Sequence, residues 1–307
     1  MKRLILVCFS VMFVCVFRGQ GFDTHWITAP VSDSTSHVWF RQTYLPQGRP
    51  QQAYIMVATT GVYKLYVNEC NVGTAVFYPS RQAGSDDIVS MTFDVTTYLR
   101  PDTNVIDLVY SPSYPNVKRR QVAVSFYGLQ ADGSSFCYNS DENWLCRQAN
   151  SRIKPDGGEV VDGRYHNPSW KAAWFDQAVR VNAEEVKVMP TEPATISTGT
   201  DLLLRVIHRR EPFYAEQVRD SVEDEFAIGV YGYARLTLRK TKQGERISIG
   251  NLDYICSGDL DEQAYPVFSL DNYRRVSVSG DKRFRRDQIF GIESVEIAPV
   301  KQTFLYE

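Results

Sequence analysis

Apolar and polar side chains alternate along the segment around residue 65. Tyr63, Leu65 and Val67 are separated by single residues, which is the two-residue period of a half-buried strand rather than the 3.6-residue period of a helix. A polar stretch, Asn68 to Asn71, follows, and asparagine tolerates the positive φ of tight turns. The pattern predicts a strand that enters a hairpin and returns through residues 72–77.

The next segment predicts one short helical turn followed by another strand. Asp94 or Thr96 can accept a backbone N–H at the start of a turn. A Pro-Asp-Thr-Asn sequence at residues 101–104 breaks that turn, because proline lacks a backbone N–H. The apolar residues from Val105 to Tyr110 then read as a strand.

The two-residue alternation recurs along most of the chain, with turn residues at short spacing, and no helical period longer than a turn or two is visible. We therefore expect an all-β protein made of two antiparallel β-sandwiches of jelly-roll type, over residues 22–183 and 184–307. A charged loop is expected over Arg219 to Glu225. Further strands are expected at Val38–Thr43, Ala53–Thr59, Gln121–Tyr127, Ser134–Tyr138, Leu202–Ile207, Ala227–Leu238, Ile247–Ile249 and Tyr273–Ser279.

The N-terminus has the layout of a secretory signal peptide over residues 1–21. Lys2 and Arg3 precede an apolar run from Leu4 to Phe17, and Gly19 and Gly21 follow. The run is shorter than the roughly 20 apolar residues that a membrane span needs. We expect an exported protein, periplasmic, cell-surface or extracellular, without a membrane span.

The charge of the chain argues against one class of partner, and its cysteines bear on possible disulfide bonds. The 34 basic and 36 acidic residues give a net charge of −2 and are scattered along the sequence, so nucleic acid is not an expected partner. Four cysteines lie beyond the signal segment, at positions 70, 137, 146 and 256, and their pairing cannot be chosen from sequence. Cys137 and Cys146 could close a disulfide-bonded loop after export, or both could remain thiols.

Short motifs follow one another in fixed order along residues 63–106: Tyr63-Lys64-Leu65-Tyr66-Val67-Asn68, Val72-Gly73, Pro79, Phe93-Asp94-Val95-Thr96, Tyr98-Leu99 and Asn104-Val105-Ile106. This series resembles the N-terminal accessory β-sandwich of bacterial α-L-rhamnosidases of glycoside hydrolase family 78, enzymes that remove terminal rhamnose with inversion. The chain departs from that family at residues 110–112, Tyr-Ser-Pro, where Gly-Trp is usual.

The C-terminal half is similar to the second accessory sandwich of the same enzymes. It has a glycine-rich strand, a Gly-Glu-Arg-Ile return, a Pro-Val-Phe segment and then a strand over residues 273–279. In that family the chemistry belongs to an (α/α)6 barrel, and twelve helices need about 200 residues. This sequence has no helical segment that could build such a barrel, so the resemblance implies accessory domains, and we assign no catalytic residue.

The segment around residue 160 resembles the motif that closes the first accessory domain in that family. Gly158-Glu159 and Asp162-Gly163-Arg164 match it, with Gly163 where alanine is usual, and tryptophans flank it. One interpretation is a sugar site in which Trp144 or Trp170 stacks on a pyranose while Glu159, Asp162 and Arg164 bind hydroxyl groups. The other is an ion-paired latch with the tryptophans as packing, which we favour because buried charges are usually paired.

Three acidic residues, Asp259, Asp261 and Glu262, lie close together in a segment bounded by Gly258 and Pro266. They could belong to a solvated turn, a calcium site or an acid pair, and we rank these in that order. No other metal site and no cofactor is expected.

The leading functional hypothesis is a non-catalytic protein that binds carbohydrate in a system degrading rhamnose-containing glycans. One alternative is an α-L-rhamnosidase-like hydrolase whose carboxylates are not recognisable. Another is an assembly subunit that pairs with a copy of itself or with a separate glycoside hydrolase.

Overall fold

The computed structural model describes residues 24–30, 33–80, 88–113, 120–166, 168–172, 186–191, 196–197 and 203–300. About 59% is strand and 5% helix, which confirms the all-β prediction. The expected signal peptide, residues 1–21, lies outside the described residues. Across the described ranges, no helix has both the length and the apolar character to cross a membrane.

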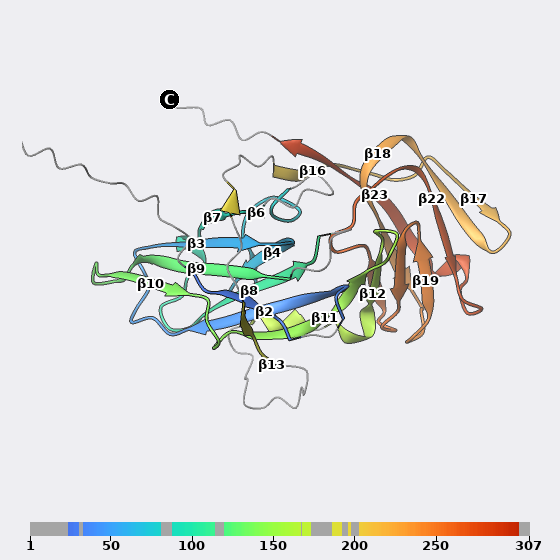
Figure 1. Cartoon of the computed structure of the whole chain (residues 1–307). Coiled ribbons are helices and arrows are strands. Elements are labelled where there is room, and N and C mark those ends of the chain that lie inside the picture. The colour runs from blue at the N-terminus through green and yellow to red at the C-terminus, as the bar shows by residue number, and fades with distance from the viewer. Residues whose placement is uncertain are drawn as a thin grey trace, which may run out of the picture.

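The first sandwich packs two sheets against each other (Figure 1). Its core contains Phe40, Ile55, Leu65 and Leu108, each fully buried. One sheet runs in the order β14 (Met189–Thr191), β1 (Trp26–Thr28), β9 (Val122–Leu129), β3 (Gln52–Thr59) and β7 (Met91–Asp94), with β10 (Ser135–Asn139) also on β9. The facing sheet contains β11 (Leu145–Ile153), β2 (Ser36–Tyr44), β8 (Asn104–Ser111), β4 (Val62–Val67) and β5 (Cys70–Asn71), with β13 (Val186–Lys187) on β11.

The second sandwich is built from one strongly curved sheet around β18, which spans Ser221–Arg239. Its core contains Phe226, Leu236, Ile247 and Val278. The strands run in the order β16 (Leu203–Arg210), β23 (Ile289–Val300), β18, β22 (Asp271–Gly280), β19 (Arg246–Ile249) and β20 (Leu252–Ile255); β17 (Tyr214–Val218) and β21 (Asp261–Ala264) also pair with β18.

One strand joins the two sandwiches. β12 (Glu159–Asp162) pairs antiparallel with β11 of the first sandwich and parallel with β20 of the second. The facing sheet of the first sandwich therefore continues into the second as one sheet of 15 strands. A separate apolar cluster, which includes Phe77, Val109, Phe268 and Ile297, fills the space between the sandwiches.

The remaining elements are short. β6 (Ile88–Val89) pairs with β15 (Ile196–Ser197). The described helices are single 3-10 turns: η1 (Thr96–Tyr98), η2 (Gly163–Tyr165), η3 (Pro168–Lys171) and η4 (Arg286–Gln288).

The local predictions around residues 61–110 hold with one change. Asn68 and Glu69 adopt positive φ in the β4–β5 turn, and the Asp94 carboxylate accepts the N–H of Thr96 at 3.0 Å where η1 begins. The return strand is shorter than expected. It ends after β5; beyond it, the Val72 N–H donates to the Leu65 carbonyl of β4 at 2.8 Å, and an isolated bridge joins Tyr63 and Tyr78.

Two boundaries differ from the sequence predictions. The charged segment Arg219 to Glu225 is not a loop beyond its first two residues, because Ser221 begins β18. Val222, Asp224 and Phe226 are buried on one face of that strand, whereas Glu223 and Glu225 on the other face are only partly buried. The first sandwich also continues past residue 183, since β13 and β14 pair with its strands β11 and β1.

Candidate functional site

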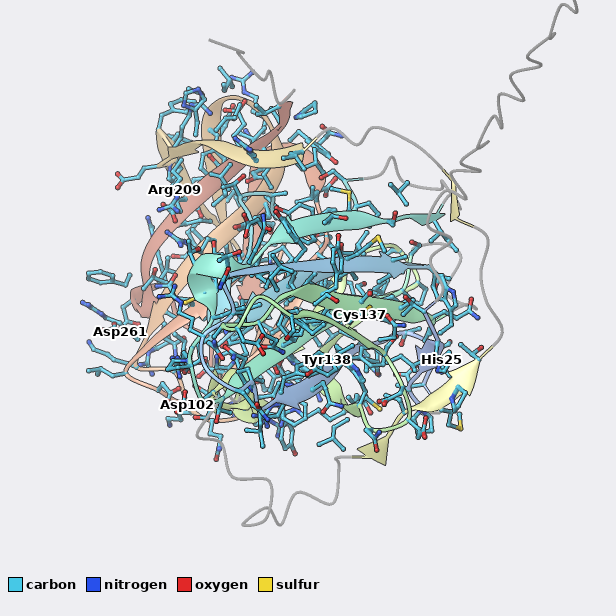
Figure 2. All side chains as sticks on the ribbon, turned by 90° about the vertical axis from the view of Figure 1, so that its left-hand side faces the viewer. His25, Asp102, Cys137, Tyr138, Arg209 and Asp261 are labelled. Atoms are coloured by element: carbon cyan, nitrogen blue, oxygen red, sulfur yellow. The ribbon has the colours of Figure 1, made fainter. Side chains whose placement is uncertain are left out.

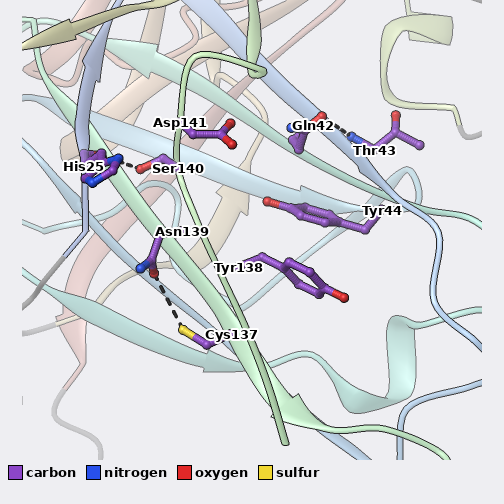
Figure 3. Close-up of a pocket in the computed structure, with 9 residues that line it drawn as sticks. All are labelled: His25, Gln42, Thr43, Tyr44, Cys137, Tyr138, Asn139, Ser140 and Asp141. Carbon is purple, nitrogen blue, oxygen red and sulfur yellow. Dashed lines mark hydrogen bonds between the residues drawn. The ribbon is translucent and has the colours of Figure 1, made fainter.

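A pocket of about 400 Å³ opens at the edge of the first sandwich, between the end of β2 and strand β10 (Figure 3). The β9–β10 hairpin turns at Asp132-Gly133, where Gly133 has φ +85°, and brings β10 alongside residues that lie almost a hundred positions earlier. The lining residues are His25, Gln42, Thr43, Tyr44 and the segment Cys137 to Asp141.

An aromatic cluster forms one wall of this pocket. The alternation of β10 directs Phe136 and Tyr138 to the same side, where Tyr138 lies 5.5 Å from Phe136 and 5.3 Å from Tyr44 between ring centroids. Tyr44 also contacts Phe126 at 5.2 Å. Phe136 is buried, but Tyr138 is 42% exposed. Burial raises the pKa of Tyr44, so its hydroxyl remains protonated and can donate a hydrogen bond.

The polar part of the pocket is held by local hydrogen bonds. The Ser140 hydroxyl donates to the His25 carbonyl at 2.6 Å and accepts the Val124 N–H at 3.0 Å, which fixes the chain at the pocket floor. The Asp141 carboxylate accepts two hydrogen bonds from Asn143, both at 2.9 Å. Asp141 is the single carboxylate among the nine lining residues, and none of them is lysine or arginine. Glycoside hydrolysis usually requires two carboxylates, so the pocket is better suited to binding a neutral polar ligand.

The five predicted sugar-binding residues do not converge. Trp144 lies in the core of the first sandwich and is fully buried. Trp170 is 1% exposed, and the guanidinium groups of Arg41 and Arg147 lie 5.4 and 4.9 Å from its ring. Neither tryptophan offers a ring face to a sugar in this structure.

The predicted latch consists of two separate contacts. Glu159 is fully buried and accepts hydrogen bonds from the backbone N–H groups of Val267 (2.7 Å), Phe268 (2.6 Å) and Ser269. Asp162 instead pairs with Arg164 through two bonds of 2.9 and 2.7 Å at the surface. Sugar binding by Asp162 and Arg164 stays a prediction.

Two basic side chains face the buried Glu159 carboxylate. Burial lowers the pKa of His37 to about 4, with Glu159 opposing this shift. Burial likewise lowers the pKa of Lys64 to about 8, again against the attraction of Glu159. Glu159 therefore links the two sandwiches through hydrogen bonds and lies within the electrostatic reach of both bases.

A second buried charge pair lies on the outer side of the same sheet. Arg41 on β2 and Asp107 on β8 are both fully buried, with 3.7 Å between Nε and Oδ1, and Arg41 also donates to the Ala172 carbonyl at 2.9 Å. Burial raises the pKa of Asp107 well above its usual range, although Arg41 and Lys171 oppose this. Sequence reasoning missed this pair, because strand alternation alone does not show that the outer face is covered.

The acidic cluster is divided among different partners. Glu262 is buried and accepts the N–H groups of Ser257 and Gly258, both at 2.7 Å. Asp259 bonds the Ser257 hydroxyl, and Asp261 pairs with Arg239. Within the described ranges, no three His, Cys, Asp or Glu side chains are grouped so as to hold a metal ion. Calcium binding by this cluster stays a prediction.

None of the four cysteines beyond the signal segment, all of which the structure describes, forms a disulfide. Cys70 and Cys137 are exposed, whereas Cys146 and Cys256 are buried. The possible Cys137–Cys146 disulfide does not form, since Cys137 lies at the surface of β10 and Cys146 in the core between β11 and its neighbours.

The pocket residues Tyr44 and Tyr138 were not among the predicted site residues. The sequence does place Tyr138 at the end of the expected strand Ser134–Tyr138, two residues after Phe136. That alternation could have indicated an aromatic side chain at the rim of the sandwich. It could not have indicated Tyr44 as its neighbour.

Residues 48–199 match the family model described as the alpha-L-rhamnosidase N-terminal domain. Among solved structures, α-L-rhamnosidases from Dictyoglumus thermophilum, Aspergillus terreus and Streptomyces avermitilis are similar to this chain, each with 16% sequence identity and with TM-scores of 0.78, 0.76 and 0.73. They match 92%, 90% and 86% of this chain. At that identity the likeness is one of fold.

The chain spans about a third of the length of these enzymes, covering 36%, 36% and 29% of them. No curated protein matches it in sequence. The matched motifs, the strand order and the family model agree that residues 48–199 form a domain of the α-L-rhamnosidase N-terminal type.

Proposed function

We propose that this protein is an exported, non-catalytic accessory protein that binds carbohydrate in the breakdown of rhamnose-containing glycans. The observation that carries the proposal is the pocket beside β10, which combines an exposed aromatic ring, Tyr138, with one carboxylate, Asp141. The match of residues 48–199 to the α-L-rhamnosidase N-terminal domain supports the choice of carbohydrate as the ligand. Export rests on the charged and apolar pattern of residues 1–21.

Binding would use both the apolar face of a sugar ring and its hydroxyl groups. The apolar face of a pyranose would pack on Tyr138, whose ring is supported from behind by Phe126 and Phe136. Sugar hydroxyl groups would donate to Asp141 and accept from the protonated Tyr44 hydroxyl. The pocket is open and small, so we expect weak binding; a millimolar dissociation constant corresponds to about 4 kcal/mol.

The test is a titration of the purified protein with L-rhamnose and a panel of neutral sugars, followed by NMR or calorimetry. Tyr138→Ala should abolish the saturable response, whereas Tyr138→Phe should keep it because the ring face remains. Tyr165→Ala is the matched control, since Tyr165 is 63% exposed on η2 and away from the pocket. A response that survives Tyr138→Ala unchanged would refute this site.

The same samples distinguish binding from hydrolysis. An aryl α-L-rhamnoside should be retained without release of the aryl product. Product release that disappears on changing Asp259, Asp261 or Glu262 would instead establish the hydrolase alternative.

A role in assembly is a second candidate, because large exposed apolar side chains gather on β16, β17 and the first half of β18. Exposed apolar groups in number usually mark an interface. We expect Phe213→Ser/Tyr214→Ser to shift an oligomer to monomer in light scattering if this surface mediates self-association; a monomeric parent protein would exclude that role for a second copy. The residues are Val206, Ile207, Phe213, Tyr214, Val218, Ile228 and Tyr231, each at least 40% exposed.

A further inference from the structure

Positive charge gathers at one end of the second sandwich, although the whole chain carries a net charge of −2. Two loops form this end: residues 240–246, which run from the end of β18 to the first residue of β19, and residues 281–288, between β22 and β23. We call the exposed cations of these two loops the basic end. They are Lys240, Lys242, Arg246, Lys282, Arg283, Arg285 and Arg286, and all are exposed.

Hydrogen bonds hold the two loops together. The Asp281 N–H donates to the Arg246 carbonyl at 2.9 Å, and the Arg283 guanidinium donates to the Gly244 carbonyl at 2.6 Å. The one carboxylate of the 240–246 loop, Glu245, is fully buried and accepts the Lys242 N–H at 2.9 Å. The cations therefore project from a fixed surface rather than from two independent loops.

Within the described residues, most of these cations form no close ion pair with a carboxylate, although Arg286 lies within electrostatic reach of the buried Asp224. Arg283 pairs with Asp281, and Arg285 pairs with Asp287. No ion pair is formed in this part of the chain by the other five members: Lys240, Lys242, Arg246, Lys282 and Arg286. Unpaired like charges held on one surface repel each other, and a bound polyanion would relieve that repulsion.

We propose that the basic end binds an acidic polysaccharide, a chain whose sugars carry carboxylates at regular intervals. The site already shows how it holds a carboxylate, because Arg283 binds Asp281 through two parallel bonds of 3.1 and 2.6 Å, the fork that suits carboxylate groups. Cations spread over two loops match a ligand with repeated charges better than one with a single charge.

The chemistry of the two loops favours a polysaccharide over a membrane or a nucleic acid. Their one large apolar side chain, Phe284, is half-buried and packs against Gly280, where an added Cβ would lie 2.5 Å from the Phe284 Cβ. The loops therefore offer no apolar group to insert into lipid and no free ring on which a base could stack.

The basic end is separate from the pocket beside β10. In Figure 2, His25, Cys137 and Tyr138 lie on one side of the molecule and Asp261, which pairs with the strand leading into the 240–246 loop, lies on the other. Binding at one surface does not require binding at the other, so failure of the pocket proposal would leave this proposal standing.

The experiment measures retention of the full-length protein by polygalacturonate in affinity electrophoresis, with dextran as the neutral polymer. Lys240→Gln/Lys242→Gln/Lys282→Gln should weaken binding to polygalacturonate about tenfold, as expected for three exposed charge pairs. Arg100→Gln/Arg209→Gln/Arg219→Gln removes the same charge from other exposed positions and should change binding less than twofold. Added salt should weaken binding by the parent protein.

Three results would overturn the proposal. The first is absence of retention by polygalacturonate at low salt. The second is an equal loss in the two triple variants, which would mean that net charge alone is responsible. The third is tighter binding to phosphatidylglycerol vesicles that is lost on Leu260→Ser, because Leu260 is 80% exposed on the neighbouring loop and would then act as a membrane anchor.

Discussion

The carboxylate of Glu159 accepts a hydrogen bond of 2.6 Å from the backbone N–H of Phe268, which lies 109 residues later in the sequence. Glu159 belongs to the strand that joins the two sandwiches, and Phe268 belongs to the apolar cluster between them. Val267 and Ser269 donate to the same carboxylate. One buried side chain thus satisfies three backbone donors of a loop that has no strand partners of its own.

Replacing Glu159 should destabilise both sandwiches together. Glu159→Ala would leave three N–H groups without their acceptor and remove the negative charge near Lys64, at a cost of roughly 2–4 kcal/mol in the free energy of unfolding. Urea unfolding followed by tryptophan fluorescence measures this cost. Asp287→Ala is the control, since Asp287 is 60% exposed in its ion pair with Arg285, and should cost less than about 0.5 kcal/mol. Equal losses in the two variants would show that Glu159 is not an anchor.

The free energy of unfolding should fall as the pH falls from about 6.5 to about 4, because His37 binds a proton in the unfolded chain but not in the folded protein. Burial lowers the pKa of His37 to about 4 in the folded protein, whereas the unfolded chain binds the proton near its usual 6.5. Over that interval the unfolded state holds more protons, so lower pH favours unfolding. The groups that face His37 are Ser151, at 2.7 Å from Nδ1, the Phe268 ring, Glu159 and Lys64.

The measurement is the free energy of unfolding at pH 7.5 and pH 5.0 in the parent protein and in His37→Asn. The parent should lose about 2 kcal/mol more than the variant between these two conditions. Parallel pH dependence in both proteins would assign the effect to other groups.

The effects of replacing Arg41 and Asp107, which form a buried pair, on the free energy of unfolding should be strongly non-additive. Asp107→Ala leaves the Arg41 charge buried without its carboxylate, which costs about 3 kcal/mol or more. The double variant Arg41→Met/Asp107→Leu removes both charges and should recover much of that loss. Thermal unfolding of the two single variants and the double variant completes the cycle, and strictly additive losses would contradict the pairing.

Two cysteines should react rapidly with a thiol reagent in the native protein. Cys70 and Cys137 are exposed, whereas Cys146 and Cys256 are buried, and burial raises the pKa of Cys256 to about 12. Brief treatment with iodoacetamide followed by peptide mapping should label Cys70 and Cys137 only, and labelling in denaturant should reach all four. Rapid native labelling of Cys146 would be inconsistent with its place in the core.

Local sequence patterns were sufficient for the strands and for the family. The alternation at Tyr63, Leu65 and Val67 places all three in the core, as expected, because side-chain direction in a strand depends only on position along the chain. The same rule explains the error at Arg219 to Glu225. Three consecutive acids at residues 223–225 suggested a loop, but Val222, Asp224 and Phe226 alternate on the buried face of β18, while Glu223 and Glu225 lie on its other face.

Tertiary structure alone decided what each side chain does. Trp144 and Trp170 have the residue type that a sugar site needs, yet packing against residues distant in sequence encloses both. Among the described strands, β10 pairs with β9 alone, and the Tyr138 ring beside Tyr44 stays 42% exposed.

The distribution of charge likewise depends on the tertiary structure and not on the sequence alone. A net charge of −2 and scattered signs indicated no basic surface, but the fold brings residues 240–246 against residues 281–288 and pairs or buries the acids among them. The period of a strand is a local property, so the sequence determined where the strands lie and which face of each turns inward. The exposure of a side chain, its bonding partners and the electrostatic field around it depend on contacts between segments far apart in the chain. Only the packed structure therefore determined them.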